Sequence, residues 1–156
     1  MNRVKTYEQT GILALSDLVL PSKKQLEKGV AILECIQEIP CNPCVDACPV
    51  HAISMKDINA PPVNNYDLCT GCTRCVGICP GLAIFVVKIK NGKAYVTLPY
   101  EFLPVPRVGD TVRGLDRAGV YQTDAVVTRV VRQGKTMVIT IEVPEQYALE
   151  IRNIQV

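Results

Sequence analysis

The sequence lacks three features that would place it in well-known classes of protein. No apolar stretch approaches the ~18 residues that a membrane span needs, and no small-residue cleavage site follows a basic segment near the start. Lys and Arg are scattered along a chain with a net charge of only +2, so no basic stripe is available for a phosphate backbone. We therefore expect a cytoplasmic protein with no membrane span and no nucleic-acid partner.

Residue combinations typical of catalytic sites are missing as well. The chain has no glycine-rich nucleotide loop, no nucleophile beside an obvious base, and a single histidine, His51. We interpret His51 as a polar turn residue rather than as a proton carrier, because that is the commoner role of a lone histidine. The sequence thus predicts a chain without a catalytic site of its own.

Cysteine, by contrast, is abundant. The chain has eight cysteines, and all of them lie between Cys35 and Cys79. The cytosol keeps thiols reduced, so this number indicates metal ligation or redox chemistry rather than disulfides.

The second cysteine group has the sequence CTGCTRCVGICP, which spaces its members as Cys69-x2-Cys72-x2-Cys75-x3-Cys79-Pro80. This is the spacing of the bacterial iron-sulfur run. Three thiolates two residues apart let one tight loop hold three corners of a cubane. Cys79 lies beyond that loop, so it predicts a second cluster, and Pro80 has no N–H with which to compete there.

An internal repeat relates the two cysteine groups. A shift of 31 residues superimposes six identical residues, which pair as Cys41 with Cys72, Cys44 with Cys75, Cys48 with Cys79, Pro49 with Pro80, Ala52 with Ala83 and Ile53 with Ile84. Six matches in one register, with a Cys-Pro pair in each half, indicate two half-sites that arose by duplication.

With these motifs, residues 30–90 resemble the bacterial-type ferredoxins that carry two 4Fe-4S clusters. The resemblance implies a pseudo-twofold, ferredoxin-like fold in which each half lends its last cysteine to the cluster of the other half. It implies that one cluster is held by Cys48, Cys69, Cys72 and Cys75, and that the other is held by Cys41, Cys44 and Cys79 with a fourth ligand.

The fourth ligand of that cluster is where this chain departs from the family, because the expected cysteine position is occupied by Glu38. We favour Cys35, which lies three residues earlier and has no other assigned role, since a soft thiolate suits iron better than a carboxylate. Glu38 as an oxygen ligand and an incomplete 3Fe-4S cluster stay open as alternatives. Cys35 could also be a small buried hydrophobe at a strand end.

Two Cys-x2-Cys pairs can also bind a zinc ion through four thiolates. Zinc needs only four ligands, however, and it gives no reason for a third cysteine at the same spacing followed by Cys-Pro. We therefore expect two 4Fe-4S clusters rather than structural zinc.

The expected fold class is α+β, with three parts. An N-terminal extension (1–29) precedes a ferredoxin-like two-cluster domain (30–98), and a small β-barrel or sheet module (105–156) follows a proline-rich linker. The expected elements are a helix over Lys23–Lys28 that begins with a Ser22/Gln25 capping box, a strand over Val30–Leu33, a hairpin turning at Asn91-Gly92, strands over Thr111–Leu115, Ala125–Val131 and Met137–Val143, and one helical turn within Glu145–Ile151.

These features together predict an electron-transfer subunit of a larger, hetero-oligomeric oxidoreductase that passes single electrons between a flavin-containing partner subunit and an acceptor. The chain is longer than a minimal ferredoxin, and its pI of about 8.1 departs from the acidic balance of free ferredoxins. With its tail EVPEQYALEIR, it resembles small iron-sulfur subunits that accompany flavin-dependent dehydrogenases of amino acids or related amines. A free-standing ferredoxin and a zinc-binding structural protein are the alternatives.

Overall fold

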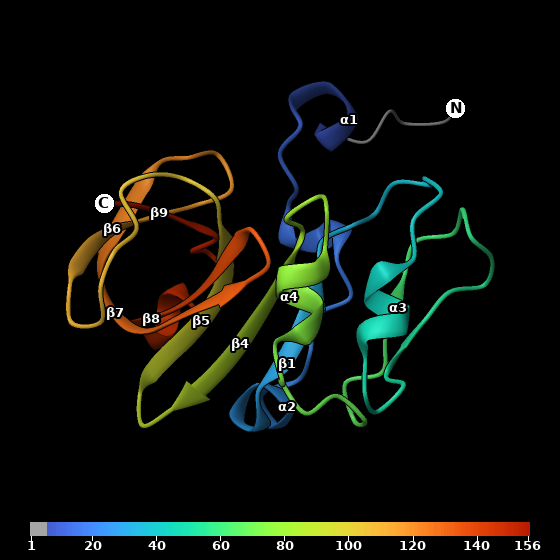
Figure 1. Cartoon of the computed structure of the whole chain (residues 1–156), viewed down its shortest axis with the longest axis horizontal. Helices are drawn as coiled ribbons and strands as arrows, with labels where there is room; N and C mark the ends of the chain where they lie inside the picture. Colours follow the sequence, from blue (N-terminus) through green and yellow to red (C-terminus); the bar gives the residue numbers. More distant parts are fainter. Residues whose placement is uncertain (1–5) are drawn as a thin grey trace.

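One antiparallel sheet of seven strands forms the body of the protein in the computed structural model, which describes residues 6–156 (Figure 1). The strand order across the sheet is β1-β4-β5-β8-β7-β6-β9. The strands are β1 (Val30–Leu33), β4 (Ile84–Lys90), β5 (Lys93–Tyr100), β6 (Thr111–Leu115), β7 (Tyr121–Gln133), β8 (Thr136–Pro144) and β9 (Asn153–Gln155). A separate pair consists of β2 (Ile53–Ser54) and β3 (Val63–Asn64).

The helices of the described chain are all short. They are α1 (Thr6–Thr10), α2 (Lys23–Lys28), α3 (Pro43–Ala47) and α4 (Arg74–Ile78), with 3-10 turns η1 (Leu15–Asp17) and η2 (Glu145–Tyr147). Among residues 6–156, none of the helices has the length and hydropathy that a membrane crossing requires.

The expected α+β ferredoxin-like fold class, with its added C-terminal module, is wrong. The chain is mostly a single large sheet, because β5 pairs with β4 along one edge and with β8 along the other. An unpaired edge of β5 would leave a row of N–H and C=O groups without partners, and β8 pairs with it from Lys93 to Tyr100. The strands of the expected module therefore continue the sheet of the cysteine-bearing segment. The limits 1–29, 30–98 and 105–156 stay predictions.

The local elements agree better with the sequence. Helix α2 begins with the expected capping box, in which the Gln25 N–H donates to Ser22 Oγ (3.2 Å) and the Ser22 N–H donates to Gln25 Oε1 (2.8 Å). The hairpin between β4 and β5 turns at Asn91 and Gly92, whose φ values of 53° and 76° are those of a type I′ turn. The expected strands over Val30–Leu33 and Thr111–Leu115 have exactly the bounds of β1 and β6.

The core runs without interruption from the sheet to the cysteine-bearing helices. Leu98, Ile139 and Ile141 are fully buried in β5 and β8, and they belong to the same buried cluster as Cys48 and Cys75. Burying each of these aliphatic side chains stabilises the fold by roughly 1.5–3 kcal/mol. The cysteine-bearing segment thus shares its core with the strands that follow it.

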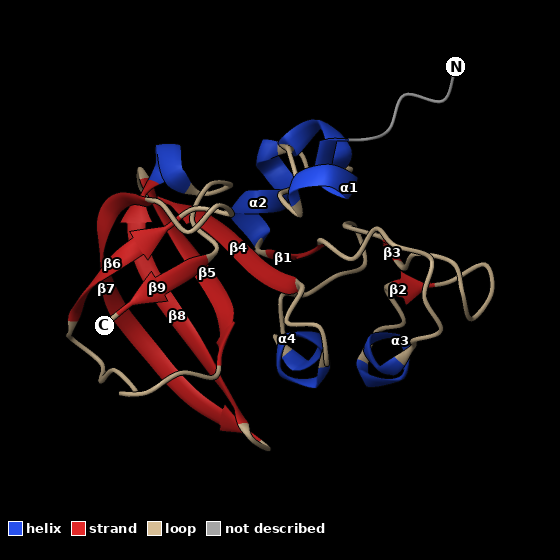
Figure 2. Cartoon of the chain, turned by 90° about the horizontal axis from the view of Figure 1, so that it is seen from above, coloured by secondary structure: helices blue, strands red, loops and turns tan. Residues whose placement is uncertain are grey.

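Helices α3 and α4 lie side by side, with α4 packed against β4 and α3 next to β2 (Figure 2). Helix α4 also approaches the end of β7. A Cβ atom on Gly77 would lie 1.7 Å from Oε1 of Gln133, so any larger residue at this position must displace that side chain.

A buried ionic cluster connects distant parts of the chain. Glu34, which directly follows β1, forms ion pairs with Arg117 in the β6–β7 turn and with Arg152 just before β9. The side chains of Glu34 and Arg152 are 5% and 4% exposed. We call this set the Glu34 triad.

Candidate iron-sulfur cluster sites

Two pockets of the structure are each lined by four cysteines. The first cysteine pocket is lined by Cys35, Cys41, Cys44 and Cys79. The second cysteine pocket is lined by Cys48, Cys69, Cys72 and Cys75. These are the two sets that the ferredoxin resemblance implies, with Cys35 as the fourth member of the first. Glu38 is exposed and does not line the first pocket.

Each short helix contributes to both pockets. Helix α3 carries Cys44, which lines the first pocket. The residue directly after the helix is Cys48, which lines the second pocket. Helix α4 carries Cys75, which lines the second pocket. The residue directly after this helix is Cys79, which lines the first pocket. The last cysteine of each half therefore crosses to the pocket of the other half.

The Cys-Pro pairs explain why each helix ends where it does. A proline disfavours helical geometry in the residue before it. Cys48, which precedes Pro49, has φ −76° and ψ 112°, and Cys79, which precedes Pro80, has φ −66° and ψ 115°. Both cysteines are therefore extended, and the chain leaves the helix at the residue that lines the opposite pocket.

The residues after each Cys-Pro pair repeat in structure as they do in sequence. His51 and Leu82 both have φ 52°, so the two halves share a left-handed turn at this position. The turn brings the Ala52 N–H to Cys48 Sγ (3.3 Å) and the Ala83 N–H to Cys79 Sγ (3.5 Å). Because an ordinary leucine serves the same turn, the structure agrees with the reading of His51 as a turn residue.

Backbone N–H groups favour the thiolate form of the sulfur that crosses over. Burial raises the pKa of the Cys48 thiol, but N–H groups of residues 50–53 outweigh burial and lower this pKa below its usual value. The Ala31 N–H similarly donates to Cys69 Sγ (3.4 Å). Such donors tune the potential of a cluster by stabilising charge on its sulfur ligands.

Cys44 and Cys75 are unfavourable places for negative charge. Burial, followed by the nearby Cys69 and Cys72, raises the pKa of the Cys75 thiol to about 12. Burial, followed by neighbouring cysteines, raises the pKa of the Cys44 thiol to about 11. Thiolates gathered in this way need a compensating positive charge, which bound iron supplies.

The donors and walls of both pockets fit an iron-sulfur cluster. The first pocket adds apolar walls from Ile39 and Ile84, and the second adds walls from Val50 and Ile53. Within residues 6–156, no three Cys, His, Asp or Glu side chains converge on a single metal-ion position.

Comparison with known families gives the same assignment. Residues 34–83 match the family described as the 4Fe-4S dicluster domain. This segment is a 4Fe-4S dicluster domain. It carries two 4Fe-4S clusters, and it contains eight cysteines, which is the number of thiolates that two such clusters need.

Two curated relatives match the chain over the same fraction of its length. A protein of Pyrococcus furiosus named "Aliphatic sulfonate oxidoreductase, polyferredoxin-like subunit" is 34% identical over 74 residues, which cover 47% of this chain and 41% of the relative. The "Ferredoxin-type protein NapF" of Haemophilus influenzae is 35% identical over 77 residues, which cover 47% of this chain and 43% of the relative. The match therefore spans less than half of each relative. No solved structure matches the chain.

Several features around the dicluster domain were not apparent from the sequence. In the sequence, Ala52 and Ala83 are only a matched pair of the repeat. Nothing there indicates that their N–H groups donate to cysteine sulfur. Tyr66 lines neither cysteine pocket, and its hydroxyl donates to the Val19 carbonyl (2.5 Å). Arg74 is exposed.

The role of Cys35 can be tested directly against that of Glu38. We expect Cys35→Ala to convert the cluster of the first pocket to a 3Fe-4S form or to remove it, because that cluster loses a thiolate ligand. Glu38→Ala should leave both clusters intact. EPR spectra of the anaerobically purified variants, together with iron and sulfide analysis, make the comparison. An intact pair of clusters in Cys35→Ala, with a loss in Glu38→Ala, would contradict the assignment.

Proposed function

We propose that this chain is an electron-transfer subunit of a larger oxidoreductase, and that single electrons pass through its two clusters between a flavin-containing partner and an acceptor. The observation that carries the proposal is the pair of adjoining cysteine pockets joined by α3 and α4. Cys35, Cys41, Cys44 and Cys79 would hold one cluster, and Cys48, Cys69, Cys72 and Cys75 would hold the other.

The protein residues suit rapid electron exchange. A 4Fe-4S cluster supplies iron that changes valence while its ligands stay in place. Four of the cysteines, Cys44, Cys48, Cys69 and Cys75, belong to the buried core, so little reorganisation accompanies the change. Cys72 is the exposed member of the second pocket, whereas Cys69 and Cys75 are buried. The loop around Cys72 is therefore a suitable point for exchange with another protein.

The subunit role is supported by the part of the chain outside the dicluster domain. The strands from β5 to β9 follow residues 34–83 and extend the sheet without adding cysteine ligands. The Pyrococcus furiosus relative is itself named as a subunit of an oxidoreductase. The flavin-containing partner comes from the resemblance of the whole sequence to small iron-sulfur subunits of flavin-dependent dehydrogenases.

The partner can be tested by purifying the chain from its own host without oxygen, under conditions that preserve complexes. We expect a flavin-containing polypeptide in fixed ratio to the chain. Adding the substrate of that flavoprotein should then bleach the visible absorption of the clusters, because electrons reach them through the flavin. The separated chain, without its partner, is the matched control and should stay oxidised. A monomer that elutes alone and accepts electrons equally from unrelated flavoproteins would instead support a free ferredoxin.

A further inference from the structure

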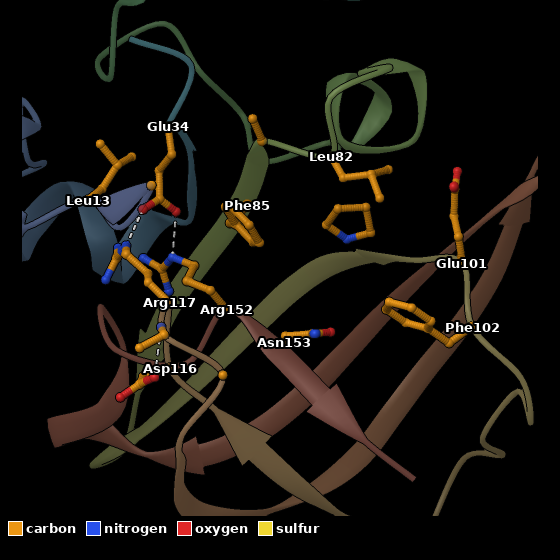
Figure 3. Close-up of a pocket in the computed structure, with 15 residues that line it drawn as sticks. Leu13, Glu34, Leu82, Phe85, Glu101, Phe102, Asp116, Arg117, Arg152 and Asn153 are labelled. Atoms are coloured by element: carbon orange, nitrogen blue, oxygen red, sulfur yellow. Dashed lines mark hydrogen bonds and ion pairs between the residues drawn. The ribbon is translucent and has the colours of Figure 1, made fainter. Parts of the chain in front are cut away.

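A large cavity of the protein lies apart from both cysteine pockets. It has a volume of about 520 Å³ and lies where the segment after β1, the start of β4, the β6–β7 turn and the start of β9 meet (Figure 3). This volume is within the range of pockets that bind small molecules, roughly 300–1,000 Å³. The Glu34 triad forms part of its wall. We call it the triad cavity.

The arginines of the triad are held firmly but are not fully satisfied. Arg152 Nε donates to Glu34 Oε2 (2.8 Å), and Arg117 Nε donates to Glu34 Oε1. The Nη1 groups donate to backbone carbonyls, that of Arg117 to Leu149 (2.7 Å) and that of Arg152 to Ile151 (2.7 Å). Nη2 of each arginine is buried and has no hydrogen-bond partner. Buried N–H groups of this kind call for an acceptor that the protein itself does not provide.

The three side chains of the triad carry one net positive charge between them. Two guanidinium groups face the single carboxylate of Glu34, so one positive charge is uncompensated within the triad. Burial lowers the pKa of Arg152 to about 10 and Glu34 opposes this shift, which leaves Arg152 charged at neutral pH. Arg152 also lies over the Phe85 ring, 5.2 Å from its centroid.

The two other carboxylates at the cavity accept hydrogen bonds from groups outside the triad, and Arg117 also attracts the charge of Asp116. Asp116 accepts the Ala118 and Val120 N–H groups of its own turn (both 2.9 Å), and Glu101 accepts from Thr136 Oγ1 (2.6 Å). Their negative charge nevertheless disfavours a multiply charged anion in the same space.

Apolar side chains supply the rest of the wall. Leu13, Phe85 and Phe102 line the cavity together with the charged residues, and Figure 3 shows Phe85 beside Arg152. Phe102 is 61% exposed, and the following residue, Leu103, is 88% exposed. The wall thus combines a cationic position with apolar surface that extends to the rim.

We propose that the triad cavity binds a small monocarboxylate with an apolar body, whose carboxylate pairs with the guanidinium groups of Arg117 and Arg152 that line the wall. The planar guanidinium matches a carboxylate in shape and charge, and the apolar walls receive the remainder of the ligand. The carboxylate belongs either to a free small molecule or to the chain terminus of a partner protein. This site lies outside both cysteine pockets and goes beyond the proposed electron transfer.

The first test uses the anaerobically purified protein with both clusters in place, and isothermal titration calorimetry. The probes are sodium hexanoate, the neutral analogue hexanamide, and inorganic phosphate. We expect hexanoate to bind at least about tenfold more tightly than either of the others, because only hexanoate offers one negative charge on an apolar body. Equal binding of hexanoate and hexanamide, or tighter binding of phosphate, overturns the proposal.

Two variants locate the binding in the cavity. Arg117→Lys and Arg152→Lys keep the charge but lose the planar donor, so each should weaken hexanoate binding by about tenfold. The matched control is Arg113→Lys, because Arg113 lies over the Tyr121 ring (4.7 Å) and does not line the cavity. If Arg152→Lys does not fold, the hexanoate affinity of Arg117→Lys alone tests the proposal. Unchanged binding in the folded lysine variants overturns the proposal.

A last arm identifies the source of the carboxylate. A tetrapeptide ending in leucine is compared with the same peptide amidated at its C-terminus. Binding of the acid about tenfold tighter than hexanoate assigns the site to a partner chain terminus, and weaker binding assigns it to a free carboxylate. An amidated peptide that binds as tightly as the acid overturns the proposal. Iron and sulfide analysis of the same sample tests the clusters separately, so failure of this site is distinguishable from failure of the proposed function.

Discussion

The variant Cys75→Ala/Cys79→Ala is expected to lose both clusters, although its two substitutions lie in the same half of the repeat. Cys75 lines the second cysteine pocket and Cys79 lines the first, so each substitution removes a ligand from a different cluster. Iron and acid-labile sulfide analysis of the anaerobically purified protein should therefore show little of either element. EPR spectra of the dithionite-reduced protein should show no 4Fe-4S signal.

The matched control is Cys48→Ala/Cys75→Ala, whose substitutions lie in different halves but line one pocket. It should retain the cluster of the first pocket, with about half of the iron and sulfide of the unchanged protein. The opposite pattern, in which Cys75→Ala/Cys79→Ala keeps half of its iron and Cys48→Ala/Cys75→Ala keeps none, would show that the halves do not exchange ligands. Far-UV circular dichroism identifies any variant that has lost its fold.

The second large effect is expected from Glu34→Gln. This change leaves Arg117 and Arg152 buried without their common carboxylate. Removing one partner of a buried ion pair lowers the free energy of unfolding by about 3–5 kcal/mol. For a chain of this size, that loss lowers the unfolding temperature by roughly 6–20 °C. Calorimetry of the anaerobic protein with its clusters in place measures the change.

The control for this prediction is Glu142→Gln. Glu142 pairs with Lys93 at the surface, where the side chains are 25% and 56% exposed, so solvent already screens the interaction. We expect a much smaller change in the unfolding temperature for this variant. If Glu34→Gln and Glu142→Gln lower the unfolding temperature equally, the triad does not stabilise the fold in the way described.

The features that could be predicted from the sequence depend on residues close together in the chain. The Ser22/Gln25 capping box spans four residues, the Asn91-Gly92 turn spans two, and both are present as expected. The Cys-Pro pairs also act locally, because each proline constrains only the preceding cysteine. The 31-residue repeat then predicted the same backbone geometry in both halves, because each half contains a Cys-Pro pair.

The parts that could not be predicted depend on contacts between distant segments. The hydrophobic alternation of β5 and β8 shows that each is a strand, but it does not show that Val96 pairs with Ile141. The α+β expectation was wrong for this reason: it treated strands after the proline-rich segment as a separate module. In the structure those strands complete the free edge of β5.

The sequence by itself determined the chemistry of this protein: eight thiols at spacings that suit two clusters, and two prolines that direct one thiol of each half away from its neighbours. Only the tertiary structure decided that Cys35 lines the first pocket in place of Glu38, and that Glu34 meets Arg117 and Arg152. The physical reason is the range of each interaction. Backbone geometry acts between neighbouring residues, whereas the Glu34–Arg152 ion pair and the pairing of β5 with β8 join distant segments and exist only after the chain has folded.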